Sequence, residues 1–154
     1  MDDTSLIVEQ YRVFNEAKER FIDRHFQTNR FYFVFAFTLL TACYVFYALS
    51  PAIVPMIVTA AFGIAVSILW WLNIDSYQVM IKIKYAKILE YLETKLPEQP
   101  FHKEFEETRK LNKAKNMTFP DVQKGFAGLL FFVFLIIFSA SVVSALNYKN
   151  AVLF

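Results

Sequence analysis

The stretch FYFVFAFTLLTACYVFYALSPAIVPMIVTAAFGIAVSILWWLNI, residues 31–74, decides the fold, because its 44 residues include no Asp, Glu, Lys or Arg. A second charge-free run, GFAGLLFFVFLIIFSASVVSALNY, covers residues 125–148. About 20 apolar residues in a helix cross the hydrocarbon core of a bilayer, so the first run holds two crossings and the second holds one. The chain is therefore predicted to be an all-α integral membrane protein with three transmembrane helices. This pattern excludes a secreted disulfide scaffold, a soluble enzyme domain of ordinary build and a disordered chain.

Prolines mark where the crossings begin and end. Pro51 and Pro55 separate the first two crossings, and Pro120 precedes the third, since proline ends one helix and can open the next. The expected segments are an amphipathic helix over 1–28, transmembrane helices over 29–49, 55–72 and 124–147, a helical segment over 73–123 and a tail over 148–154.

The distribution of positive charge predicts the orientation. Residues 1–30 carry 5 of the 16 Lys and Arg residues, and residues 73–124 carry 10, whereas the loop around Pro51 carries none. Lys and Arg in short loops favour the cytoplasmic side of the membrane. We therefore expect the N-terminus and residues 73–123 in the cytoplasm, and the C-terminal tail outside.

Two amphipathic segments are expected to form the cytoplasmic region. No Gly or Pro occurs between Met1 and Ser50, so the N-terminal helix is expected to run directly into the first crossing. We further expect one helix from about Pro55 to Leu96, whose extension beyond the membrane carries an apolar stripe. The stripe, a candidate subunit contact, consists of Tyr77, Ile81, Tyr85, Ile88 and Leu92. It needs a partner, which the N-terminal helix of the same chain and a second copy can supply.

The two charge-free runs contain small and hydroxyl residues but no Asp, Glu, Lys or Arg. Three helices are too few to surround a water-filled path, so any pore must be made by several copies. Small side chains also let neighbouring helices approach closely, and that alternative stays open for each residue. The candidate pore-lining or helix-packing residues are Thr38, Thr41, Thr59, Gly63, Ser67, Ser141 and Ser144.

Signals of catalysis are few, and we expect no enzyme, no cofactor and no metal site. The pair Arg20 and His25 has the Arg-x4-His spacing of a HEPN ribonuclease motif, in which Arg stabilises phosphate charge and His transfers a proton. The alternative is a juxtamembrane cluster of Arg24, His25 and Arg30 that meets lipid phosphates. Basic residues of 82–115 alternate with glutamates, which argues against nucleic-acid binding.

One segment carries a family resemblance. The run Trp71-Leu72-Asn73-Ile74-Asp75-Ser76-Tyr77, followed by Lys84-Tyr85, Leu92-Glu93 and Leu96-Pro97, resembles the RipA-like family of octameric bacterial membrane proteins. The residues that match its motif are Trp71, Ser76, Tyr77, Lys84, Glu93 and Pro97. The chain departs from the family at Gln78, Met80 and Ile81.

The resemblance implies a homo-octamer in the bacterial inner membrane. A related protein is the small membrane pore protein that accompanies a type VI-B CRISPR ribonuclease, so the implied role is membrane depolarisation in anti-phage defence, with that ribonuclease as a functional partner. Three hypotheses follow in order: an oligomeric pore, a non-conducting membrane scaffold that recruits a cytoplasmic partner, and a HEPN-type ribonuclease. The expected physical partners are further copies of the chain and the lipid bilayer.

Overall fold

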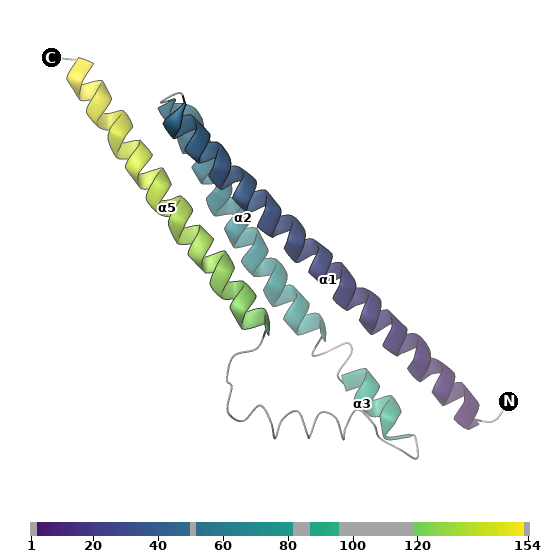
Figure 1. Cartoon of the computed structure of the whole chain (residues 1–154). Helices are drawn as coiled ribbons and strands as arrows, with labels where there is room; N and C mark the ends of the chain where they lie inside the picture. Colours follow the sequence, from purple (N-terminus) through teal and green to yellow (C-terminus); the bar gives the residue numbers. More distant parts are fainter. Residues whose placement is uncertain (1–2, 50–51, 82–86, 96–118, 153–154) are drawn as a thin grey trace. The chain divides into compact units, whose positions relative to one another are not determined.

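The computed structural model describes residues 3–49, 52–81, 87–95 and 119–152. Of these residues 96% are helical and none forms a strand, which confirms the predicted all-α class. The helices in chain order are α1 (Asp3–Ala48), α2 (Ile53–Met80), α3 (Lys87–Glu93) and α5 (Phe119–Val152), and Figure 1 follows them along the chain. Helices α1, α2 and α5 are long and apolar enough to cross a membrane, in agreement with the three predicted crossings.

Helix α1 is a single element of 46 residues, about 70 Å long at 1.5 Å per residue. It confirms the prediction that the amphipathic N-terminal segment continues into the first crossing. The physical reason is the absence of Gly and Pro between Met1 and Ser50, since those residues are the usual causes of a break.

The start of α2 agrees with the proline signal, and the helical region that follows ends slightly before the expected position. Pro55 lies in the first turn of α2, where its missing N–H costs no hydrogen bond. Helix α2 ends at Met80 and α3 ends at Glu93, before the expected end at Leu96. The Lys95 amide donates to the Leu92 carbonyl over 3.1 Å, an i to i−3 bond that tightens and closes the last turn. The expected continuity between α2 and α3 falls on residues 82–86, outside the described residues.

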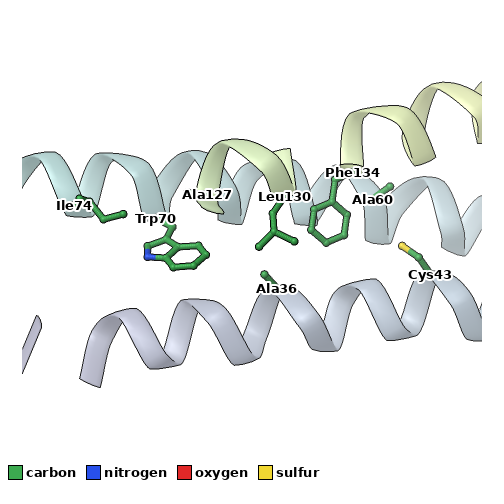
Figure 2. Close-up of a cluster of buried hydrophobic side chains, with 8 residues drawn as sticks. All are labelled: Ala36, Cys43, Ala60, Trp70, Ile74, Ala127, Leu130 and Phe134. Carbon is green, nitrogen blue, oxygen red and sulfur yellow. The ribbon is translucent and has the colours of Figure 1, made fainter. Parts of the chain in front are cut away.

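The chain divides into two compact units, which are described separately. Unit 2 combines Thr28–Ile74 with Val122–Phe154 and so contains the three charge-free helical segments. Its buried core takes residues from all three helices, and Figure 2 shows these side chains pointing toward one another. They are Ala36 and Cys43 of α1, Ala60, Trp70 and Ile74 of α2, and Ala127, Leu130 and Phe134 of α5.

Unit 1 combines Met1–Gln27 with Asp75–Asp121. Its described parts are the first half of α1, the end of α2, helix α3 and the first three residues of α5. Apolar burial in this unit includes Leu89 and Leu92 of α3, together with the charged Glu93, which is buried as well. The unit is therefore built from the amphipathic segments that the sequence placed outside the bilayer.

Candidate functional site: aromatic and small-residue contacts between the helices

A buried hydrogen bond joins the first two spans. The indole Nε1–H of Trp70 donates to Oδ1 of Asn29 over 2.8 Å, across 41 residues of sequence. Tyr32 stacks on Trp70 with ring centroids 6.3 Å apart and planes 7° from parallel. Both partners of the hydrogen bond are buried, so the bond is shielded from competition with water. The bond fixes how far α1 is shifted along its axis relative to α2 inside unit 2.

The adjacent residue Trp71 lies in a different environment. Trp70 is 3% exposed, whereas Trp71 is 42% exposed, so the two tryptophans do not act as a uniform interfacial pair. Trp71 contacts Gly128 of α5, where a Cβ on the glycine would lie 3.3 Å from the indole ring. Trp71 therefore remains a candidate for an interfacial anchor, while Trp70 is a packing residue of the core.

The predicted small-residue row of α2 meets α5 within one copy. The ring of Phe134 lies on Gly63 so closely that any Cβ there would overlap it. Ser67 is buried, and its hydroxyl donates to the carbonyl of Gly63 over 2.9 Å. Thr59, the third member of the row, is partly buried. For Gly63 and Ser67 the helix-packing interpretation therefore applies in the single chain.

The other hydroxyl candidates divide between buried and exposed positions. Ser141 is 1% exposed and donates to the carbonyl of Ile137 over 2.6 Å. Thr38 and Thr41 are exposed, and each donates to a carbonyl four residues earlier over 2.9 Å. Ser144 is also exposed. Because back-bonding satisfies the O–H donor of each threonine, these residues tolerate apolar surroundings and still present a hydroxyl oxygen as an acceptor.

In unit 1 an aromatic stack joins α1 to α2. Tyr77 of α2 stacks on His25 with centroids 3.4 Å apart and planes 7° from parallel. The Tyr77 ring also stacks on Phe21, at 5.2 Å and 12°. Phe21 and His25 are one turn apart on α1, which places both rings on the same face. Partial burial raises the pKa of the Tyr77 phenol, because the charged phenolate is poorly solvated there.

The structure does not bring Arg20 and His25 together. His25 is 7% exposed and occupied by the stack, while the Arg20 side chain is 63% exposed, with Glu16 at 3.8 Å. Five residues along an α-helix separate two side chains by about 140°, so they lie on different faces. Within one copy, the two side chains therefore do not face a common point on α1.

The predicted subunit-contact stripe is partly used inside the chain. Tyr77 packs on α1, and Leu92 is buried, whereas Ile81 and Ile88 are partly exposed. Among the residues that match the family motif, Ser76 is exposed and Glu93 is buried. Tyr85, Lys84 and Pro97 lie outside the described residues.

Some contacts were missed by the sequence analysis although weak signals were present. Phe21 and His25 have the spacing of four that predicts a shared face, and Asn29 is a polar residue at the entrance of a span. No feature of the sequence singled out Phe134 among the many phenylalanines of α5.

Comparison with known proteins gives one result. The model of the octameric membrane protein family (8xMP) matches residues 8–143, which is most of the chain and extends into all three spans. Neither the curated proteins nor the solved structures include a significant match.

Proposed function

The chain belongs to the octameric membrane protein family, and from this premise we propose that its copies form a ring that encloses a membrane pore. Oligomerisation in a membrane follows from the family and from the three spans. The pore is the further step, and it assigns no catalytic role to any residue. A single copy has too few helices to surround a water-filled path, so the ring would supply the enclosure.

The observation that supports a pore is the position of Thr38 and Thr41. Asn29, Ala36 and Cys43, spaced by seven residues, form the buried face of α1 in unit 2. Thr38 lies about 160° around the helix from Ala36, and Thr41 lies about 140° away, so both are on the opposite side. They thus present hydroxyl groups on a face of α1 that is exposed among the described residues.

The wall that these residues would form is weakly polar. Val34 and Val45 share this face of α1 and are exposed, and both threonine hydroxyls are bonded to backbone carbonyls. A narrow constriction of this kind can exclude water and conduct only when it widens. We propose such gating by dewetting as the way in which the closed ring stays impermeable to ions.

The cellular part of the proposal comes from charge and from resemblance. The Lys and Arg distribution favours a cytoplasmic N-terminus and an outside C-terminus in a bacterial inner membrane. The likeness to a pore protein that accompanies a type VI-B CRISPR ribonuclease supports membrane depolarisation in anti-phage defence. The ribonuclease would act as a functional partner, without direct nucleic-acid binding by this chain.

Conductance of the purified oligomer in planar bilayers tests the pore. In a Cys43→Ala background, Thr38→Cys and Thr41→Cys should each lose current when a charged, thiol-reactive methanethiosulfonate is added. Phe62→Cys on α2 is the control, because Phe62 is exposed but belongs to another helix. Absence of current, together with an unchanged membrane potential in expressing cells, would contradict the proposal. The scaffold hypothesis would then predict a cytoplasmic partner that is lost when residues 98–120 are deleted.

A further inference from the structure

A closed ring of identical copies, on which this inference rests, requires two different surfaces on each copy, one for each neighbour. In a ring whose axis is perpendicular to the membrane, the two surfaces must also lie at the same depth. Unit 2 carries a concave surface, and α1 carries an exposed aromatic stripe; both can be placed on a common scale of depth.

The concave surface is an apolar groove of about 240 Å³ between α2 and α5. Its small residues, Ser67, Ala127 and Gly128, form the floor, and Ile68, Trp71 and Phe132 stand beside them. Ser67 and Ala127 are buried, whereas the other three side chains are 42–62% exposed. A cavity of about 150 Å³ with an apolar lining holds one benzene, so this groove has room for an aromatic ring.

The stripe lies on α1. Phe33, Phe37 and Tyr44, spaced by four and seven residues, share one face and are 43%, 44% and 69% exposed. Phe26, seven residues before Phe33, continues the stripe and is half exposed. Phe26 precedes Arg30 and follows Arg24, so it lies outside the charge-free run, where contact with lipid does not account for its exposure.

A second aromatic pair lies on the other flank of α1. Phe31 stacks on Phe35, and Phe31 also contacts Tyr32, whose ring stacks on Trp70. The Phe33 ring packs on Phe37, with centroids 4.6 Å apart. Both flanks are exposed, and the Phe33 flank is the one that continues through Phe26 beyond the charge-free run.

The Trp70–Asn29 hydrogen bond sets the depth of both surfaces. Phe33 is four residues beyond Asn29, about 6 Å further into the span, and its ring leans back toward the helix N-terminus. Helix α2 runs the opposite way, so Ser67 lies about 4.5 Å further in than Trp70. Gly128 touches Trp71 near the level of the hydrogen bond, and Phe132 is one turn deeper on α5. The Phe33 ring and the groove thus occupy the same layer.

We propose that the Phe33 ring of one copy inserts into the α2/α5 groove of the next copy in the ring. If a fully exposed aromatic side chain has about 200 Å² of accessible surface, the side chains of the stripe from Phe26 to Tyr44 together expose about 400 Å². A specific interface buries at least about 500 Å² on each partner, so the stripe supplies most of the required area. The Phe33 ring then packs as a knob into a hole formed by the small residues around Gly128, as in the knobs-into-holes packing of helices.

Cysteine cross-linking in native membranes tests the contact. In the full chain with Cys43→Ala, the pairs Phe33→Cys with Ile68→Cys and Phe33→Cys with Phe132→Cys should give, on oxidation, a ladder of species up to eight copies. Phe33→Cys with Leu129→Cys is the matched control, because Leu129 is 58% exposed at the depth of the groove but does not line it and lies about 100° around α5 from Gly128. The single Phe33→Cys variant should remain largely monomeric in denaturing gels.

The possible results separate this contact from the pore itself. A ladder without conductance would support the interface and overturn the pore. Conductance in the cysteine pairs without any ladder would support the pore and overturn the interface. Efficient dimer formation by Phe33→Cys alone would also overturn it, because it would show a symmetric contact between two stripes.

Filling the groove gives an independent measurement. Gly128→Leu should lower the octamer fraction in native mass spectrometry at least five-fold, whereas Gly125→Leu should leave it unchanged, since open space surrounds Gly125. An intact Gly128→Leu octamer that loses bound phospholipid would show that an acyl chain occupies the groove, and would overturn the proposal. If Gly128→Leu does not accumulate in cells, the cross-linking result tests the contact between Phe33 and the groove.

Discussion

The aromatic ring of Phe134 occupies the space that a Cβ on Gly63 would need. Phe134 is fully buried, and its contact with Gly63 brings the backbone of α2 next to the largest buried side chain of α5. In a bilayer the helices gain little from hydrophobic association, because lipid tails are as apolar as the side chains. Close packing of this kind is therefore a principal source of stability for unit 2.

Replacement of Gly63 by alanine should destabilise the protein by about 1–3 kcal/mol, because the added methyl group must displace the Phe134 ring. The free energy of unfolding can be measured by titration with SDS in mixed micelles. Gly125→Ala is the matched control, since nothing lies within 4 Å of its Cβ position, and the better helix propensity of alanine should keep it neutral or slightly stabilising. Equal effects of both substitutions would contradict the contact.

Trp70→Phe should remove the Nε1–H donor to Asn29 and cost about 0.5–2 kcal/mol, the range for buried hydrogen bonds inside membranes. Trp71→Phe should cost less, because Trp71 is 42% exposed and belongs to the groove wall. The same SDS titration compares the two variants. Trp71→Phe also leaves Trp70 as the only tryptophan of the chain. Its emission should then be insensitive to aqueous quenchers. A strongly quenched Trp70 would show that the hydrogen bond is not shielded.

His25→Phe should keep the stability of unit 1 nearly unchanged, whereas His25→Ala should lose about 0.5–1.5 kcal/mol of ring stacking in addition to buried area. The rank order distinguishes a packing role from proton transfer, for which phenylalanine is no better than alanine. Thermal unfolding in detergent measures the stability, and cleavage of a labelled RNA checks for activity. RNA cleavage abolished equally by His25→Phe and His25→Ala would instead favour a ribonuclease.

The sequence predicted the parts of the fold that depend on local properties. Charge-free runs located the three spans, and the lack of Gly or Pro before Ser50 predicted the continuous α1. The row Thr59, Gly63 and Ser67 predicted a face for close helix approach, and in the structure Gly63 lies against Phe134 while Ser67 is buried. These features can be predicted from sequence because each depends on a single segment of the chain.

Contacts between distant segments were not predictable in the same way. Asn29 and Trp70 are 41 residues apart, and no periodicity links a residue on one span with its partner on another. Phenylalanine is equally compatible with lipid, with the core and with a subunit interface, so its abundance does not identify Phe134 as buried or Phe33 as exposed. Arg20 and His25 have a motif's spacing, and on α1 this spacing puts the two side chains about 140° apart, so a ribonuclease activity stays a prediction.

The Tyr77 phenol should make the stability of the stack depend on alkaline pH. Burial raises the pKa of Tyr77 in the folded protein, whereas the unfolded chain titrates near about pH 10. Below about pH 10 the phenol is protonated in both states, so its contribution to stability is fully present. Above that pH the unfolded chain loses the proton first, so the free energy of unfolding falls as pH rises through the folded pKa. Tyr77→Phe lacks this proton and should lose less stability between pH 8 and pH 11.

Thermal midpoints of the two proteins in the same detergent measure the difference, and parallel pH curves would show that the phenol contributes nothing. Comparison within one pair of proteins cancels the titration of the remaining tyrosines, which both variants share.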